Sequence, residues 1–131
     1  IGPFARLRNN VNVGKDTKIG NFVELKNSSL ENDVKISHLS YIGDAEIQDS
    51  ANIGAGTITC NYDGVNKHKT TIGKRSFIGS NTSLIAPINI GNDASIAAGS
   101  SISKDVDSNS LAITRAPIRF ITNWSKKFKK R

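Results

Sequence analysis

An aliphatic residue recurs every six positions along most of the chain. Neither the 3.6-residue period of a helix nor the alternation of a simple strand gives a strict repeat of six. The spacing instead predicts a parallel β-helix, in which three hexads form one coil and the aliphatic side chains stack into apolar columns. The predicted inward positions, of which only Thr59 is not aliphatic, are Ile1, Leu7, Val13, Ile19, Leu25, Leu30, Ile36, Ile42, Ile47, Ile53, Thr59, Ile72, Ile78, Leu84, Ile90, Ile96 and Ile102. Seventeen hexads correspond to between five and six coils.

Glycine and small residues occupy fixed places within the repeat. Glycine follows the aliphatic residue at Gly2, Gly14, Gly20, Gly43, Gly54, Gly73, Gly79 and Gly91. A small or β-branched residue stands four positions after it, at Ala5, Val11, Thr17, Val23, Ser29, Val34, Thr57, Ser76, Thr82, Ala94 and Ser100. Glycine relieves crowding where the backbone turns, and β-branched residues suit extended backbone. The pattern therefore predicts short strands joined by tight corners.

Three interruptions break this regularity. The spacing falls to five between Leu25 and Leu30 and between Ile42 and Ile47, and it widens to thirteen between Thr59 and Ile72. The widest break contains the polar segment 61–69, NYDGVNKHK, whose Asp-Gly pair favours a turn. Loops on a rigid frame often carry function. We therefore expect the functional residues at these interruptions.

The composition is that of an ordinary folded domain, with 37% hydrophobic and 22% charged residues. The formal net charge is +7, but six of the 18 basic residues lie in 119–131, which leaves 12 basic against 11 acidic residues in 1–118. We expect a solvated basic terminus rather than a nucleic-acid-binding surface. No apolar run reaches the roughly 20 residues that cross a membrane. We expect no membrane partner.

The chain has few residues that could bind a metal or form a disulfide. Cys60 is its only cysteine, which excludes an intrachain disulfide and favours the cytoplasm. Its two histidines, His38 and His68, are too few for the three-histidine zinc site of β-helical carbonic anhydrases. We expect no metal site. Spacing alone places the His38 side chain on the outside of a coil.

Three segments resemble a known family: 1–8 (IGPFARLR), 38–47 (HLSYIGDAEI) and 52–64 (NIGAGTITCNYDG). They are similar to the C-terminal domain of the bacterial bifunctional N-acetylglucosamine-1-phosphate uridyltransferases/glucosamine-1-phosphate N-acetyltransferases. The resemblance covers about residues 1–117. It implies an all-β fold, a left-handed parallel β-helix over 1–117. The short C-terminal tail, 118–131, matches the family less closely; its apolar residues recur at intervals of three to four, which permits a short amphipathic helix, at Ile118, Ile121, Trp124 and Phe128. We expect this tail to pack on a neighbouring subunit.

The resemblance also implies an activity, namely transfer of the acetyl group of acetyl-CoA to the amine of glucosamine 1-phosphate. This is a step towards UDP-N-acetylglucosamine for peptidoglycan and lipopolysaccharide. His38 is then the general base, and Glu24 is a candidate to orient it. The residues implied to bind the sugar phosphate are Arg8, Lys26, Tyr41, Asn52 and Lys67. Those implied to bind acetyl-CoA are Ala55, Asn61, Tyr62, Ser80, Ala98 and Arg115. The family further implies a homotrimer with active sites between subunits, and Mg²⁺ only in a uridyltransferase domain that this chain does not contain.

Three alternatives remain open from the sequence. Cys60 could form an acetyl-cysteine intermediate. The same fold could acetylate another acceptor, such as serine, an antibiotic or a lipid-linked sugar. The chain could also be a non-enzymatic β-helix, structural or binding nucleic acid through its basic tail.

Overall fold

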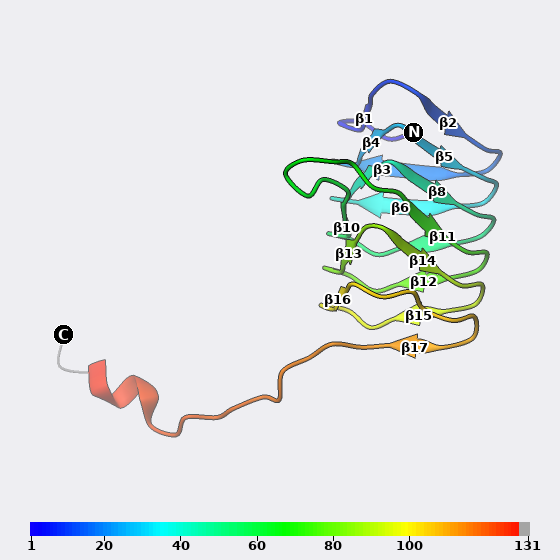
Figure 1. Cartoon of the computed structure of the whole chain (residues 1–131). Helices are drawn as coiled ribbons and strands as arrows, with labels where there is room; N and C mark the ends of the chain where they lie inside the picture. Colours follow the sequence, from blue (N-terminus) through cyan, green and yellow to red (C-terminus); the bar gives the residue numbers. More distant parts are fainter. Residues whose placement is uncertain (129–131) are drawn as a thin grey trace.

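The computed structural model describes residues 1–128, so the last three residues of the predicted basic tail lie outside the described residues. Within this range the chain forms seventeen short strands and one 3-10 helix. The strands follow one another around a triangular prism, coil upon coil (Figure 1). There are five complete coils and a sixth in which Val106 forms a single parallel bridge with Ile90 in place of a strand.

Each face of the prism is one parallel sheet. The first sheet contains β1 (Arg6–Leu7), β4 (Glu24–Lys26), β7 (Tyr41–Gly43), β10 (Ile58–Cys60), β13 (Ser83–Ile85) and β16 (Ser101–Ile102). The second contains β2 (Val11–Val13), β5 (Ser28–Leu30), β8 (Ala45–Ile47), β11 (Thr70–Ile72) and β14 (Ile88–Ile90). The third contains β3 (Lys18–Asn21), β6 (Lys35–His38), β9 (Asn52–Ile53), β12 (Phe77–Ile78), β15 (Ser95–Ile96) and β17 (Leu111–Ala112). The all-β parallel β-helix predicted from the repeat is confirmed.

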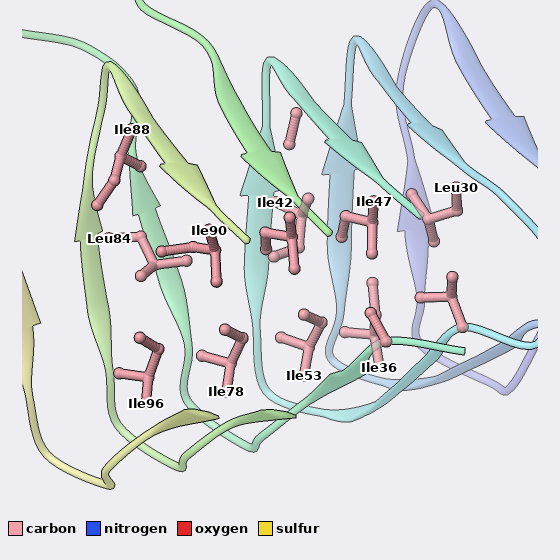
Figure 2. Close-up of a cluster of buried hydrophobic side chains, with 14 of the residues drawn as sticks. Leu30, Ile36, Ile42, Ile47, Ile53, Ile78, Leu84, Ile88, Ile90 and Ile96 are labelled. Atoms are coloured by element: carbon pink, nitrogen blue, oxygen red, sulfur yellow. The ribbon is translucent and has the colours of Figure 1, made fainter. Parts of the chain in front are cut away.

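The aliphatic columns form the core. In the third sheet, strand register places Ile36 beside Ile53, Ile53 beside Ile78, and Ile78 beside Ile96. Figure 2 shows this row with the matching side chains of the other two sheets pointing to the same axis. Burying each such side chain contributes about 1.5–3 kcal/mol. The first coil is the exception: Ile1 is 76% exposed and Leu7 37% exposed, because these side chains have a neighbouring coil on one side only.

The predicted small position of one hexad is corrected by the structure. Ser29 was assigned to the small position that follows Leu25 by four, a position that is buried at Val23 and Val34, but the side chain of Ser29 is exposed and that of Ser28 is buried. The hexad that begins at Leu25 lacks one residue, and this residue is missing before the small position. Which residues of β5 point inward is therefore found by counting back from the following aliphatic residue, Leu30, which lies two positions after Ser28.

All three interruptions lie on one edge of the prism. The chain passes from the first to the second sheet through residues 8–10, 27, 44, 61–69 and 86–87, which we call the insertion edge. The two shortened hexads turn at Asn27 and Asp44, whose φ angles are positive, and asparagine and aspartate adopt this conformation more readily than most residues. The long excursion 61–69 lies one coil further and projects from the prism (Figure 1). Residues that are far apart in the sequence therefore lie above one another along this edge.

The chain leaves the prism after β17. Figure 1 shows residues beyond it extending away to a short 3-10 helix, Trp124–Phe128. The predicted amphipathic segment thus includes one turn of helix, in which Trp124 and Phe128 meet edge to face with ring centroids 5.4 Å apart. Large apolar side chains of this arm are exposed, with Ile118 at 80% and Phe120 at 88%. Among the described residues, no helix has the length and apolar character needed to cross a membrane.

Candidate functional site

A cluster of polar side chains occupies the insertion edge. The Asp44 carboxylate accepts hydrogen bonds from the side-chain amides of Asn27 and Asn61, each 2.7 Å long. The Lys26 ammonium lies 3.7 Å from the same carboxylate, and both side chains are nearly buried, at 13% and 12% exposure. The amide of Asn61 also donates to the Tyr41 hydroxyl at 3.3 Å. Four of the predicted site residues therefore meet here: Lys26, Tyr41 and Asn61 directly, and Lys67 through the electrostatic contacts described next.

The pKa values of this cluster reflect its crowding. Burial raises the pKa of the Asp44 carboxyl, but the Asn27 and Asn61 hydrogen bonds and the nearby lysines outweigh it, so the pKa lies below its ordinary value. The pKa of the Lys67 ammonium is lowered, chiefly by the side chain of Lys26, whose ammonium beside it disfavours a second positive charge. The charges of Asp44 and Tyr41 have the opposite effect and raise the pKa of Lys67. Two cations and one carboxylate at close range form a site suited to a multiply charged anion.

The excursion that carries Lys67 is held by its own turn. Oδ1 of Asp63 accepts hydrogen bonds from the backbone N–H groups of Val65 and Asn66, at 2.8 and 2.6 Å. Its other oxygen lies 2.7 Å from Nε2 of His68, and this hydrogen bond is the main reason that the pKa of Asp63 falls to about 2. His68 thus serves to fix the loop.

Gly43 gives the cluster room. A Cβ atom at this position would overlap the Tyr41 hydroxyl and would lie 2.7 Å from the Asn61 side-chain nitrogen. Glycine is therefore required for the Tyr41 phenol and the Asn61 amide to cross over β7. The glycine position that the hexapeptide pattern assigned to a corner has here a second role in shaping the site.

Glu24 begins β4 in the first sheet, and Arg8 follows β1 at the insertion edge. Nη1 of Arg8 donates to the Glu24 carboxylate at 3.3 Å, and Arg6 lies 3.7 Å from the same carboxylate. Glu24 is opposite Tyr41 in the register of β4 and β7. In this structure Glu24 pairs with arginines, and its predicted role in orienting His38 remains a prediction.

His38 ends β6 at the edge where the chain returns from the third sheet to the first. We call this the histidine edge; it comprises residues 22–23, 39–40, 54–57, 79–82 and 97–100. The imidazole is exposed, as spacing predicted, and its Nδ1 atom lies 3.2 Å from Oδ1 of Asn21 on the preceding coil. Asn21 was not among the predicted site residues.

Several residues predicted to bind acetyl-CoA form a line along the histidine edge. Backbone hydrogen bonds join the coils there, from the N–H of Asn81 to the carbonyl of Ala55 and from the N–H of Gly99 to the carbonyl of Ser80, both 2.8 Å. Arg115 closes the line, since its guanidinium donates two hydrogen bonds to the Ala98 carbonyl at 2.9 and 3.2 Å. His38, Ala55, Ser80, Ala98 and Arg115 thus follow one another on successive coils.

Tyr62 and Asn52 lie apart from both groups. Tyr62 is exposed in the excursion, where it pairs with Lys67 in an antiparallel bridge and donates from its hydroxyl to the Gly64 carbonyl at 2.8 Å. Asn52 lies in β9 of the third sheet, on the outer face between Lys35 and Phe77. Within one chain, the structure therefore places Asn52 on a different face of the prism from Lys26 and Tyr41.

A groove of about 590 Å³ runs from the polar cluster onto the second sheet. It is lined by Asn10, Asn12, Asn27, Ser28, Ser29, Asp44, Ala45, Glu46, Lys67, His68 and Lys69. Its polar lining and the Lys67 ammonium suit a hydrophilic charged ligand rather than an apolar one. Among the residues that the structure describes, no group of three or more His, Cys, Asp or Glu side chains is arranged to hold a metal ion.

Comparison with known proteins gives matches over the whole chain. Residues 69–104 match the family model described as the hexapeptide repeat of succinyl-transferase. The chain is 55% identical over 131 residues to the bifunctional protein GlmU of Zymomonas mobilis, covering 100% of this chain and 29% of that protein. It is 57% identical over 130 residues to GlmU of Thermodesulfovibrio yellowstonii, covering 99% of this chain and 29% of the relative. The chain thus spans less than a third of the length of these relatives.

Among solved structures, the fold is shared with AntD, an N-acyltransferase from Bacillus cereus. The TM-score is 0.78 at 19% identity, and the match covers 98% of this chain and 85% of AntD. At this identity the likeness concerns the fold. The sequence matches are more specific, and they extend from the first residue of the chain to the last. Over its whole length the chain is therefore similar to the C-terminal part of the bifunctional GlmU proteins.

Proposed function

We propose that the chain transfers the acetyl group of acetyl-CoA to the 2-amino group of glucosamine 1-phosphate, giving N-acetylglucosamine 1-phosphate and CoA. The GlmU relatives support this proposal through their identity to the whole chain. AntD supports the class of reaction, since it is an N-acyltransferase solved with dTDP-4-amino-4,6-dideoxyglucose and coenzyme A. The observation that carries the proposal is the Lys26–Asp44–Lys67 cluster, an anion site at one edge of the sheet whose other edge carries His38.

The cluster fits the phosphate of the acceptor. Lys26 and Lys67 supply two ammonium groups against the single Asp44 carboxylate, so the cluster keeps one net positive charge for a dianion. Arg8 can add a planar guanidinium with two parallel hydrogen bonds to phosphate oxygens. Tyr41 lies between Glu24 and Ile58 in the sheet register and presents a hydroxyl beside the amine-bearing ring. The phosphate thereby fixes the position of the sugar.

His38 serves as general base. Its neutral imidazole takes a proton from the amine while the amine nitrogen attacks the thioester carbonyl. The tetrahedral intermediate then releases CoA thiolate, which receives a proton as the amide forms. Direct transfer needs no covalent enzyme intermediate, and half-buried Cys60 is left out of this scheme.

Acetyl-CoA is placed along the histidine edge. Neighbouring strands in a sheet are separated by about 4.8 Å, so the four steps from His38 to Arg115 span roughly 19 Å. An extended pantetheine arm can follow this line, with the thioester near His38 and a nucleotide phosphate near the Arg115 guanidinium. Ala55, Ser80 and Ala98 leave the edge open because their side chains are small. Asn61 and Tyr62 lie on the insertion edge, so they contact a cofactor bound in this way from a neighbouring copy of the chain.

The position of Asn52 supports a trimer with shared active sites. Asn52 and Lys26 lie on different faces of one chain, so a single small sugar phosphate reaches both only if a second copy contributes one of them. Exposed apolar side chains lie on both of these faces, with Ile58 and Ile85 on the first sheet and Phe77 and Leu111 on the third. A contact between two different faces generates a closed ring when its rotation closes after three copies, as the three-sided prism favours. The exposed C-terminal arm then packs on a neighbour.

Light scattering tests this assembly. A mass of three chains is expected, and a monomer with full activity would refute the trimer.

We place the reaction in the cytoplasm, which suits a chain with one unpaired cysteine.

The decisive experiment measures free CoA released by the chain from acetyl-CoA with glucosamine 1-phosphate as acceptor. Glucosamine without the phosphate is the matched control, since it retains the amine and loses the group that the two lysines bind. Strong release with the phosphorylated sugar and weak release with glucosamine support the proposal. Equal rates indicate another acceptor. No release, together with salt-dependent binding to any duplex, indicates a non-enzymatic nucleic-acid-binding module.

A further inference from the structure

Asp44 is held by hydrogen bonds to both its backbone and its carboxylate. Its backbone N–H donates to the Lys26 carbonyl at 3.0 Å, and its carbonyl accepts from the Thr70 N–H at 3.1 Å. Its carboxylate accepts from Asn27 on the coil on one side and from Asn61 at the start of the excursion on the other. Asp44 is thus anchored to the coils on both sides of its own, and its carboxylate is almost fully covered.

The contacts of Asp44 reach both halves of the site. On one side its carboxylate lies 3.7 Å from the Lys26 ammonium, which is placed to bind phosphate. On the other it accepts a hydrogen bond from Asn61, which begins the loop that carries Tyr62 and Lys67. A charged hydrogen bond at a covered position resists exchange with water. The geometry of both groups therefore depends on one carboxylate.

We propose that Asp44 is a positioning residue for acetyl transfer, which fixes Lys26 and Asn61 relative to each other and so joins the phosphate-binding and acetyl-CoA-binding parts of the site. This inference rests on the proposed function for the identity of the two ligands. Asp44 itself need not touch either ligand, because its carboxylate is already occupied by the two amides and Lys26.

An opposite role for the same carboxylate gives an opposite prediction. If Asp44 only competed with phosphate for the lysines, removing its charge would strengthen the binding of the sugar phosphate. If it positions the lysine and the amide, removing its charge weakens binding despite the more positive cluster. Asp44→Asn separates the two, because asparagine keeps the shape of the side chain and tolerates the positive φ angle of 51° at this residue.

Asp33→Asn is the matched control. Asp33 turns a corner on another edge with a similar φ of 56°, and its carboxylate accepts a hydrogen bond from the Ser50 hydroxyl at 3.1 Å away from the polar cluster. Losing a charged hydrogen bond in Asp44→Asn should raise the KM for glucosamine 1-phosphate about tenfold and the KM for acetyl-CoA about threefold, with kcat little changed. Asp33→Asn should leave all three constants at the parent values.

The pH profile adds a readout that a purely structural change would not move. The charged groups around Lys67 are Lys26, Asp44, Tyr41 and, in the adjoining groove, Glu46, His68 and Lys69. Of these, Asp44 helps keep Lys67 protonated. In Asp44→Asn the alkaline limb of kcat/KM for the sugar phosphate should therefore move to lower pH. Adding Lys67→Arg, which does not titrate in this range, should return the limb to higher pH.

Asn27→Gly separates geometry from charge, and it also serves if Asp44→Asn fails to fold. Glycine suits the positive φ of Asn27, and the variant removes one donor while leaving the Asp44 charge in place. A smaller rise in the KM for the sugar phosphate, with an unmoved alkaline limb, is expected. An unchanged or lowered KM in both Asp44→Asn and Asn27→Gly overturns the proposal.

Calorimetric titration of each variant with glucosamine 1-phosphate, in the absence of acetyl-CoA, keeps the two proposals distinguishable. If the parent chain releases no CoA but binds the sugar phosphate about tenfold more tightly than Asp44→Asn, acetyl transfer is refuted and the positioning role stands. If the parent chain is active and the two bind equally, the positioning role is refuted alone.

Discussion

Oδ1 of Asn21 lies 3.2 Å from Nδ1 of His38, on adjacent strands of the third sheet. An amide oxygen can only accept, so this contact places the imidazole proton on Nδ1 and leaves the lone pair on Nε2. A general base needs such a free lone pair directed at its substrate. Asn21 thereby selects the tautomer of His38 that can take a proton from the amine.

Substituting Asn21 should change the pH dependence of catalysis. In Asn21→Asp a carboxylate faces the imidazole of His38 and favours its protonated form. Because the base must be neutral, the acid limb of the kcat profile should move to higher pH. Asn21→Leu, which cannot accept a hydrogen bond, should lower kcat by about tenfold without moving KM. Superimposable pH profiles for Asn21→Asp and the parent would contradict this role.

Removing the base itself should have a larger effect. His38→Ala should lower turnover by about 10²- to 10⁴-fold while acetyl-CoA binding, followed by calorimetry, stays near the parent value. Cys60→Ala is the companion variant and should keep its activity, because direct transfer uses no thiol. A normal rate in His38→Ala would remove this residue from the mechanism, and a complete loss in Cys60→Ala would favour an acetyl-cysteine intermediate.

The core can be tested at Ile90, which is 2% exposed in β14, the end strand of the second sheet. Ile90→Asp buries a carboxylate without a partner and should cost more than about 4 kcal/mol, enough to unfold the chain. The neighbouring Asn89 is exposed on the same strand, so Asn89→Ser should change the free energy of unfolding by no more than about 0.5 kcal/mol. Thermal unfolding followed by circular dichroism compares the stabilities of the two variants with that of the parent chain. A cooperative transition for Ile90→Asp near that of the parent would contradict the inward register.

The fold could be predicted because its information is local. A column needs only one aliphatic residue per hexad, and this residue can be identified in the sequence for every hexad of the column that contains Ile36, Ile53, Ile78 and Ile96. Ser29 was misplaced because a shortened hexad does not reveal which of its residues is missing. Ile1 and Leu7 are exposed because the first coil has a neighbour on one side only. A repeat pattern treats every hexad alike, so it does not distinguish the first coil from the others.

The site could be predicted in part. The interruptions of the repeat all lie on the insertion edge, where the polar cluster is found, and a count of three hexads per coil would also have aligned Asn27, Asp44 and Asn61. Asp44 and Asn27 were missed because aspartate and asparagine at a corner are ordinary turn residues. Asn21 was missed because its partner lies one coil away, at a distance set by strand pairing. Ala55 and Ala98 carry no signal of their own, since their place depends on the edge they line.

Thr70 offers a test of packing beside the site. Among buried side-chain oxygen and nitrogen atoms of the described residues, Thr70 Oγ1 is the one without a hydrogen-bond partner. Thr70→Val removes the unpaired hydroxyl at constant shape and should stabilise the fold by about 1 kcal/mol. Thr82 is equally buried but donates to the Gly79 carbonyl at 2.7 Å, so Thr82→Val should destabilise by about 1 kcal/mol. Denaturant unfolding measures both, and a destabilised Thr70→Val would mean that its hydroxyl has a partner in solution.

The turn that presents Lys67 should remain folded at unusually low pH. The pKa of Asp63 is lowered to about 2 from an ordinary 3.8, mainly by the His68 hydrogen bond. A lowered carboxyl pKa contributes stability that is fully present above the ordinary value and is lost as the pH falls through about 2. The amide resonances of Val65 and Asn66, which donate to Asp63, should therefore titrate with a midpoint near the lowered pKa.

The variant Asp63→Asn removes the titrating group and should abolish that transition. It should also weaken binding of the sugar phosphate, because the turn no longer holds Lys67 in place. A midpoint near the ordinary value in the parent chain would show that the Asp63–His68 contact is absent in solution.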